Sequence, residues 1–359
     1  MLRSISIGYV PYSKNLNHPG DRRRLGILSN SSRYHLNTDS PLMSELLILS
    51  GASNFNYWIK RSDKPIILDL VDGYLGETPS FFKDSLRNFI RSINGTSNYG
   101  AITYSRALKK ACTMATAIIV ASNEQADLVK PFNKRVFVIL DDHSELDVAK
   151  ELRKSNFEKD SSRRFIFWEG FGYTLKHFKF ISKDLDKFLV ENDYYLQILT
   201  TPTFAKWGGY IGRIDSKKFI SKWFHNSRQR IQVVPWTLEN VIWNASISEF
   251  ALIPIDTRDR FADLKPENKL LSMWHMGIPT LFSDTKAYTR VAEKTGVQSF
   301  CITKSGWGDA LKEIKAMQIS ESMKKVSTFL EQSHTKEILI NQWESAIDHV
   351  FEIHRSLKE

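Results

Sequence analysis

Residues 246–284 read SISEFALIPIDTRDRFADLKPENKLLSMWHMGIPTLFSD and contain the pattern that decides the fold. FALIPID at 250–256 is apolar enough for a buried strand, and PTLFS at 279–283 predicts a second one. Between them, residues 269–276 predict a short helix that ends before Gly277. A strand, a helix and a strand in this order are typical of a parallel sheet covered by helices.

The same alternation of apolar runs and helix-like stretches continues along the chain. Further predicted strands are SISIGYV (4–10), PIILDLV (65–71), AIIVAS (117–122), RVFVIL (135–140), RFIFWEG (164–170), YYLQILTT (194–201) and RIQVVPW (230–236). Because the segment 147–164 is polar and charged, we place a linker there. We predict an α/β protein with two Rossmann-like domains facing across a cleft. The expected domains are 1–155 and 156–335, with a C-terminal helix at 336–359 that could pack on the first.

The composition is that of a globular protein, with 359 residues, 42% of them hydrophobic and 25% charged. No apolar run approaches the roughly 18 residues of a membrane span. MLRSISIGYV at the start predicts a first strand rather than a signal peptide. Cys112 and Cys301 lie far apart without metal-ligand spacing, which favours a reducing compartment. We therefore expect a cytoplasmic protein.

The formal net charge of +10 favours anionic partners such as nucleotide phosphates or lipid headgroups. Residues 1–150 carry 19 Lys and Arg against 14 Asp and Glu, a net +5, and the remainder carries the other +5. With Trp207, Trp223, Trp236, Trp243 and Trp274, this charge permits docking at the inner face of a membrane, although core packing explains most tryptophans equally well. Because no nucleic-acid motif is present, we expect no nucleic-acid partner.

Several groups in the second half predict a phosphate site. A helix N-terminus attracts anions, and Lys269 adds a full charge there beside Glu267 and Asn268, although Asn268 could instead be a plain N-cap. The turn after the strand at 164–170 carries two glycines that let a backbone approach a ligand. The candidates in these two places, and in the loop before the helix, are Gly170, Gly172, Lys176, Arg258, Glu267, Asn268 and Lys269.

Polar residues also follow the predicted strands of the first half. Asp21 or His18 could act as a base on an acceptor hydroxyl, and His143 is a further proton acceptor. Arg22, Arg23 and Arg24 offer forked donors for phosphate, but successive helical positions cannot all face one site. Asp72 could meet an acceptor or cap the next helix. For Asp72 and His143, a structural hydrogen bond is the simpler interpretation.

The segment Asp184–Leu185–Asp186 matches D-x-D, a pattern that binds a metal ion in some enzymes. Because it lies in a helix-like, Lys-rich stretch, we interpret it as a solvated face. We expect no metal and no cofactor.

The chain resembles the GT-B glycosyltransferases, most closely their nucleotide-sugar-dependent group 4. The match rests on Pro266, Lys269, Leu270, Leu271, Gly277 and Pro279 in 246–284, with support from PWTLENV (235–241), WEGFG (168–172), PIILDLVDGYL (65–75) and ATAIIVASNEQADLV (115–129). The resemblance implies a metal-independent hexosyl-type transfer from a nucleotide-sugar to a glycan or lipid-linked acceptor, as in bacterial surface polysaccharide synthesis. The second domain would bind the donor and the first the acceptor.

One position departs from this family pattern. Ser272 stands where the family commonly has a Glu that binds the nucleotide ribose, and the usual pair of Glu residues is missing. The departure supports an alternative in which the chain is a non-catalytic subunit or glycan-binding partner of another glycosyltransferase. An epimerase acting on nucleotide-sugars is a second alternative with the same fold.

Overall fold

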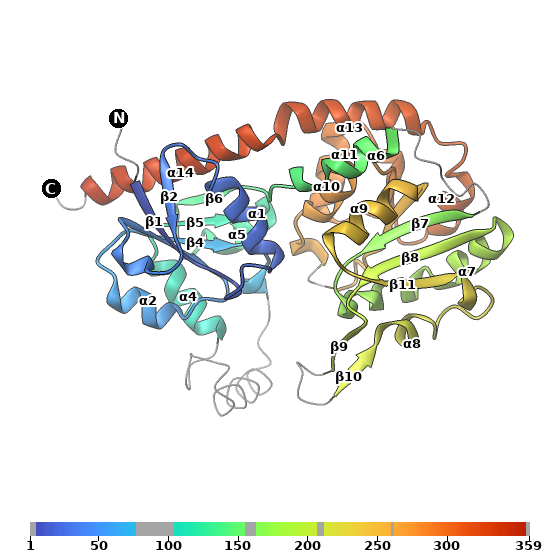
Figure 1. Cartoon of the computed structure of the whole chain (residues 1–359), viewed down its shortest axis with the longest axis horizontal. Helices are drawn as coiled ribbons and strands as arrows, with labels where there is room; N and C mark the ends of the chain where they lie inside the picture. The colour runs from blue at the N-terminus through green and yellow to red at the C-terminus, as the bar shows by residue number, and fades with distance from the viewer. Residues whose placement is uncertain (1–4, 77–103, 155–162, 207–211, 260–261, 357–359) are drawn as a thin grey trace. The chain divides into compact units, whose positions relative to one another are not determined.

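The computed structural model describes residues 5–76, 104–154, 163–206, 212–259 and 262–356. The chain forms two compact units, each built on a six-stranded sheet (Figure 1). Unit 1 comprises residues 1–142, 264–266 and 333–359, and unit 2 comprises residues 143–263 and 267–332. The expected boundary at 155–156 lies outside the described residues.

In unit 1, six parallel strands are arranged in the order β2-β1-β3-β4-β5-β6. They are β1 (Ile5–Val10), β2 (Tyr34–Asn37), β3 (Leu46–Ser50), β4 (Ile66–Leu70), β5 (Ala117–Val120) and β6 (Val136–Val138). Successive residues of β3 pack into opposite cores, with Leu46 and Ile48 on one face and Leu47 and Leu49 on the other. A strand buried on both faces needs an unbroken apolar run, which is why these strands are visible in the sequence.

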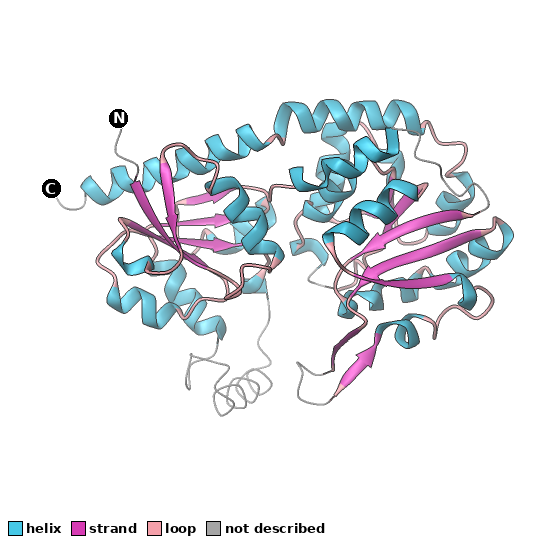
Figure 2. Ribbon diagram, viewed as in Figure 1, coloured by secondary structure: helices cyan, strands magenta, loops and turns pink. Residues whose placement is uncertain are grey.

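Helices cover both faces of the unit 1 sheet (Figure 2). They are α1 (Pro19–Leu28), α2 (Phe55–Arg61), α4 (Tyr104–Met114), α5 (Asn123–Val129) and α14 (Lys336–Ser356), with the short turns η1 (Pro41–Met43) and η2 (Tyr74–Gly76). The C-terminal helix α14 contributes Trp343 and Ile347 to the same core as Ile7 and Ile48. The last helix of the chain therefore completes the core that begins with the first strand.

Unit 2 holds the second parallel sheet, with strand order β11-β8-β7-β12-β13-β14. Its strands are β7 (Arg164–Glu169), β8 (Tyr194–Thr200), β11 (Ile231–Pro235), β12 (Phe250–Ile253), β13 (Thr280–Ser283) and β14 (Cys301–Ile302). A separate antiparallel pair, β9 (Thr203–Ala205) and β10 (Arg213–Asp215), lies between β8 and β11 in the chain. The prediction of two Rossmann-like domains is confirmed.

The helices of unit 2 follow its strands in the doubly wound manner. They are α6 (Asp147–Lys154), α7 (Ser182–Glu191), α8 (Ser216–Ile220), α9 (Leu238–Ile247), α10 (Asn268–His275), α11 (Lys286–Thr295), α12 (Trp307–Glu313) and α13 (Ile319–Ser333). Shorter turns are η3 (Ser144–Leu146), η4 (Gly172–Phe180), η6 (Arg228–Arg230), η7 (Ala262–Leu264) and η8 (Gln298–Phe300). The segment expected to be a linker begins with α6.

Helix α10 starts and ends through local backbone geometry. Glu267 is its N-cap residue, so Asn268 lies inside the first turn and the interpretation of Asn268 as the cap is wrong. At the other end Gly277 adopts a φ of +68° and donates to Trp274 O, while Ile278 N donates to Met273 O. This pair of hydrogen bonds is a Schellman motif, in which glycine takes the left-handed position at no steric cost.

In the part of the chain that the structure describes, no helix combines the length and apolarity needed to cross a bilayer.

Candidate functional site

The strand order of unit 2 reverses at the carboxyl ends of β7 and β12. The chain runs from β7 to β8 and β11 on one side, then returns to place β12 on the other side of β7. In open α/β sheets, ligands bind beyond the carboxyl ends of the strands at such a reversal. Gly170 follows β7 directly, and the loop after β12 leads to α10. The topology therefore places a candidate ligand site at these two connections.

Lys269 and the glycine turn, which the sequence singled out separately, lie against each other at this reversal. The Lys269 Nζ atom lies 4.2 Å from the centroid of the Trp168 ring, a cation–π contact. Gly170 has a φ of +156°, and a Cβ atom added to it would lie 2.7 Å from Lys269 Nζ. The backbone conformation therefore favours glycine at this position, and the absence of a Cβ leaves the ammonium group close to the main chain. A main chain without a side chain thus lies beside a cation, and an anion can bind favourably at such a place.

A second cation lies at the start of α10, and the sequence analysis missed it. The Arg290 NH2 atom is 3.3 Å from both carboxylate oxygens of Glu267, whose side chain is buried. Arg290 belongs to α11 and carries no local motif, so only the fold reveals its position. Glu267 thus orients a neighbouring guanidinium at the helix N-terminus.

Further polar groups line the carboxyl edge of the sheet. The indole Nε1 of Trp236, in the loop after β11, donates to Glu169 Oε2 at 3.0 Å and ties that loop to the end of β7. At the end of β8, the Thr200 side chain is buried and its Oγ1 atom has no hydrogen-bond partner among the described residues. Buried polar atoms in folded proteins normally form hydrogen bonds, so the Thr200 hydroxyl remains available for a hydrogen bond at this edge.

The charged groups of the loop after β12 pair with one another. Lys176 Nζ lies 2.8 Å from Asp259 Oδ2, and Arg258 contacts both oxygens of Asp256 at 2.9 and 2.6 Å. The hydrogen bonds from Arg258 lower the pKa of Asp256 to about 2. Arg258, a candidate for the phosphate site, thus forms an ion pair within its own loop.

Ser272 faces the interior of unit 2. Its Oγ donates to Asn268 O at 2.9 Å and lies 3.0 Å from His143 Nδ1, and both side chains are buried. Because the serine hydroxyl donates to the carbonyl, His143 Nδ1 is the donor in the second contact. Ser272 therefore anchors His143, and this contact favours the structural interpretation of His143 over proton transfer.

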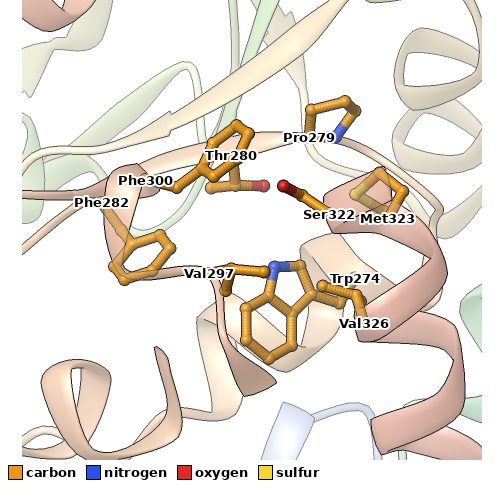
Figure 3. Close-up of a pocket in the computed structure, with 9 residues that line it drawn as sticks. All are labelled: Trp274, Pro279, Thr280, Phe282, Val297, Phe300, Ser322, Met323 and Val326. Carbon is orange, nitrogen blue, oxygen red and sulfur yellow. The ribbon is translucent and has the colours of Figure 1, made fainter. Parts of the chain in front are cut away.

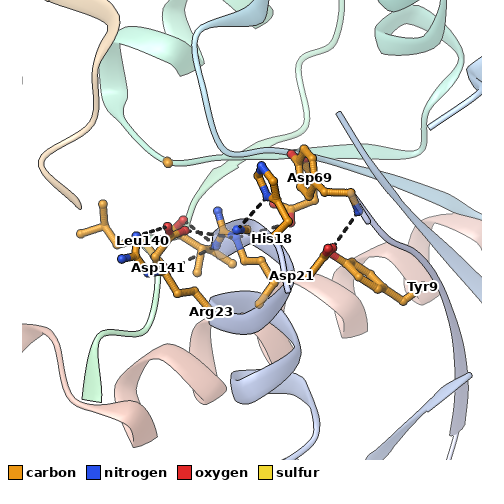
Figure 4. A network of polar contacts seen from close by, with 12 residues as sticks. Tyr9, His18, Asp21, Arg23, Asp69, Leu140 and Asp141 are labelled. Carbon is orange, nitrogen blue, oxygen red and sulfur yellow. Dashed lines mark hydrogen bonds and ion pairs between the residues drawn. The ribbon is translucent and has the colours of Figure 1, made fainter. Parts of the chain in front are cut away.

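In unit 1, Asp21 organises the loop after β1 (Figure 4). Its Oδ1 accepts from Tyr9 OH at 3.0 Å and Tyr12 N at 2.7 Å, and its Oδ2 accepts from the backbone N–H and the hydroxyl of Ser13, both at 2.9 Å. The side chain is fully buried. A carboxylate held by four donors stabilises the loop, and these contacts occupy the lone pairs that a base would use.

His18 caps α1 in the same loop. Its Nδ1 accepts from Gly20 N at 3.1 Å, and its ring stacks on Tyr12 with centroids 4.8 Å apart. Burial lowers the pKa of His18, which favours the neutral ring. With Nδ1 as acceptor, the proton of the neutral ring is on Nε2, so His18 presents a donor rather than a base.

The three consecutive arginines diverge, as helix geometry requires. Arg24 is buried, with its Nε 3.4 Å from both Asp69 Oδ2 and Asp141 Oδ1 and its NH1 donating to Ile139 O at 3.0 Å. Arg23 lies 3.7 Å from Asp141 (Figure 4), and Arg22 is half-buried. Arg24 is thus a structural group, which leaves Arg22 and Arg23 as the candidate phosphate ligands.

Asp72, the remaining acceptor candidate, is exposed at the end of the segment after β4. Its Oδ1 accepts from Gly73 N at 2.8 Å. This short contact fixes the turn.

Asp69 should make the stability of unit 1 depend on pH. Burial, partly opposed by Arg24, raises its pKa from 3.8 to about 6. The folded state then holds the proton more tightly than the unfolded state, so the Asp69 contribution to the free energy of unfolding falls as pH rises from about 4 to 6.5. We expect the difference in the free energy of unfolding between wild type and Asp69→Asn to decrease by on the order of 2 kcal/mol across this range. Urea unfolding at several pH values measures it, and a pH-independent difference would contradict the assignment.

The D-x-D segment is solvated only in part, because Asp184 is exposed as predicted but Asp186 is not. Asp186 is buried and accepts hydrogen bonds from Asn226 N at 3.1 Å, Asn226 Nδ2 at 2.9 Å, and the backbone N–H and the hydroxyl of Ser227 at 2.9 and 2.5 Å. It therefore serves to fix the loop before β11. Within the described ranges, no three His, Cys, Asp or Glu side chains form a cluster that could hold a metal ion.

An apolar pocket lies at the opposite, amino-terminal end of β13 (Figure 3). Its lining residues are Trp274, Pro279, Thr280, Phe282, Val297, Phe300, Ser322, Met323 and Val326. The Thr280 hydroxyl there already donates to Ile278 O at 2.9 Å. Because the lining contains no cation, the pocket does not suit a phosphate.

Neither a protein-family model nor a curated protein sequence shows a significant match to this chain. Similar solved structures exist. An alpha-glucosyltransferase in complex with UDP and a 13-mer DNA is 12% identical with a TM-score of 0.60, over 97% of this chain and 99% of that chain. A glycosyltransferase from Rickettsia africae is 11% identical with a TM-score of 0.56, over 97% and 99%. WaaG, a glycosyltransferase involved in lipopolysaccharide biosynthesis, is 12% identical with a TM-score of 0.53, over 95% and 97%.

TarM is another similar structure, with 10% identity and a TM-score of 0.55 over 84% of this chain. The match covers 54% of TarM, so the chain spans about half of that protein's length. At such identities the comparison concerns the fold. With two Rossmann-like units and these structural neighbours, the chain has the fold of the GT-B glycosyltransferases.

Proposed function

We propose that this protein transfers a sugar from a nucleotide-sugar donor to a glycan or lipid-linked acceptor, as in the assembly of a surface polysaccharide. The observation that carries the proposal is the convergence of Lys269, Gly170 and the N-terminus of α10 at the reversal of the unit 2 sheet. The UDP in one structural neighbour supports a nucleotide as the ligand.

In this proposal, unit 2 binds the diphosphate of the donor. The helix N-terminus supplies backbone N–H groups with a partial positive charge, and Lys269 supplies a full one. Both would stabilise the negative charge that develops on the leaving diphosphate when the bond to the sugar breaks. Unit 1 would bind the acceptor through hydrogen bonds donated by His18, Arg22 and Arg23.

A second candidate function is a non-catalytic partner of another glycosyltransferase. It is favoured by Ser272, which stands at the position of the ribose-binding Glu in the resembled family and makes its hydrogen bonds to Asn268 and His143. The chain would then lack one contact to the nucleotide-sugar donor. Both functions are compatible with the same fold, so a ligand measurement has to separate them.

Thermal unfolding in the presence of UDP, GDP, ADP, CMP and their sugar derivatives tests the proposal. A ligand at one hundred times its Kd stabilises the native state by about 2.7 kcal/mol, so we expect a selective rise in Tm with one nucleotide. The sugar derivative of that nucleotide should then release nucleoside diphosphate when acceptor is added. If no nucleotide at millimolar concentration raises the Tm, the partner function becomes the better explanation. Product analysis separates transfer from epimerisation.

A further inference from the structure

Much of the positive charge of the protein is concentrated in one insertion of unit 2. Residues 201–230, which connect β8 to β11, contain seven Lys and Arg residues and one acidic residue, Asp215, for a formal charge of +6. The whole chain carries +10. Residues 1–150 and residues 151–359 each carry a net charge of +5, but within the second segment the charge is concentrated in this insertion.

The described part of this insertion forms β9, β10 and α8, at the lower edge of unit 2 in Figure 1. Six of its basic side chains are exposed. The five that lie between residues 206 and 222, namely Lys206, Arg213, Lys217, Lys218 and Lys222, are called the basic patch. The single acid, Asp215, accepts from Lys218 N at 2.7 Å and caps α8. Its carboxylate therefore serves the helix start rather than a basic side chain of the patch.

The charges of the basic patch are not compensated by ion pairs within the described residues. Arg213 donates to Thr203 Oγ1 at 2.6 Å and to Thr203 O at 3.1 Å, both neutral acceptors. Exposed lysines on other helices differ, since Lys154 and Lys312 each have an acidic partner one turn away. The positive charge of the basic patch therefore remains available to attract a negatively charged partner.

Aromatic side chains lie among these cations. The rings of Phe204 and Phe219 have centroids 5.3 Å apart, those of Phe219 and Trp223 are 5.0 Å apart, and Lys222 Nζ lies 5.6 Å from the Phe219 centroid. All three aromatic residues are half-buried. A tryptophan and phenylalanines flanked by lysines are typical of surfaces that lie at the headgroup level of a bilayer.

We propose that the basic patch and these three aromatic residues dock unit 2 onto an anionic phospholipid membrane. Four of the five cations are lysines, whose compact charge suits diffuse attraction to a charged surface better than forked recognition of one phosphate. Phe204 also packs against Gly172, so the insertion adjoins the glycine turn of the candidate donor site. Docking would hold that edge of unit 2 beside a lipid-linked acceptor. The membrane contact itself stands independently of the proposed catalysis.

Co-sedimentation with lipid vesicles tests the proposal with the full chain. We expect binding to vesicles of phosphatidylcholine with 30% phosphatidylglycerol, little binding to pure phosphatidylcholine, and loss of binding at high salt. Lys217→Gln with Lys218→Gln should lower the partition coefficient roughly thirtyfold, about fivefold for each charge removed. Circular dichroism would establish that the variant is folded.

The matched control is Lys324→Gln with Lys325→Gln, an exposed lysine pair on α13 of the same unit. It makes the same change in net charge, and we expect it to change vesicle binding by no more than about twofold. Equal losses in both variants would show a general charge effect and overturn the assignment to this surface. Binding of soluble polyphosphate or duplex DNA through the patch, with no vesicle binding, would overturn the membrane as its partner.

Discussion

Lys269→Ala should lower nucleotide affinity by roughly ten- to a hundredfold, the loss expected when a charged hydrogen-bond donor to phosphate is removed. The side chain lies over Trp168 with its ammonium group beside Gly170, at the N-terminus of α10. The variant keeps the helix and its backbone N–H groups but loses the only full charge contributed by the first turn of α10. Isothermal titration with the nucleotide that raises the Tm would measure the change, and sugar transfer should fall at least as far.

Two further variants separate charge from packing. Lys269→Met keeps an apolar stem over Trp168 and should lose affinity almost as much as the alanine variant, because the charge is what it removes. Lys183→Ala changes an exposed lysine at the corresponding second position of α7 in the same unit, and it should bind the nucleotide normally. If Lys183→Ala weakened binding as strongly as Lys269→Ala, a local phosphate contact by Lys269 would be refuted.

Arg24→Met should destabilise the protein by about 3–5 kcal/mol, the cost of leaving buried carboxylates without their cation. Arg24 is fully buried, contacts Asp69 and Asp141 at 3.4 Å, and lies 5.3 Å from the centroid of the Trp343 ring. It therefore links the ends of two strands to α14. Urea unfolding followed by circular dichroism at pH 7 would measure the loss.

Arg23→Met is the matched control on the same helix. Arg23 is partly exposed and its ion pair with Asp141 is long at 3.7 Å, so we expect a loss of less than about 1 kcal/mol. Similar destabilisation by both variants would show that burial of Arg24 between the two carboxylates does not determine the stability. Lowering the pH should reduce the cost of Arg24→Met, because protonated Asp69 no longer needs a cation.

Local signals were sufficient for most of the secondary structure around the candidate site. The apolar runs of β7, β12 and β13 are continuous because both faces of a parallel sheet are buried. The end of α10 followed from Gly277, whose left-handed conformation a side chain would resist. The start of α10 was displaced by one residue, because Glu267 caps through its backbone without a side-chain signal.

Contacts between distant segments could not be predicted in the same way. The sequence indicated that three neighbouring arginines must diverge. It did not indicate which one is buried: Arg24 is, because it contacts Asp69 in β4 and Asp141 in the segment after β6. Asp186 was predicted to be solvated, yet the loop at 225–227 folds over it and donates its N–H groups. The spacing of hydrophobic residues indicates the buried face of one helix or strand. It does not indicate which distant residues contact that element.

The sequence by itself determined the two-domain α/β architecture and the position of the candidate phosphate site, because strand burial, helix capping and glycine geometry are local properties of the chain. The tertiary structure alone decided that Lys269 meets Trp168 and Gly170, that Arg290 joins Glu267, and that Ser272 turns inward to His143. The contact of Lys269 with Trp168 and Gly170 joins the loop after β12 to the end of β7, which are neighbours because the strand order of the sheet reverses there.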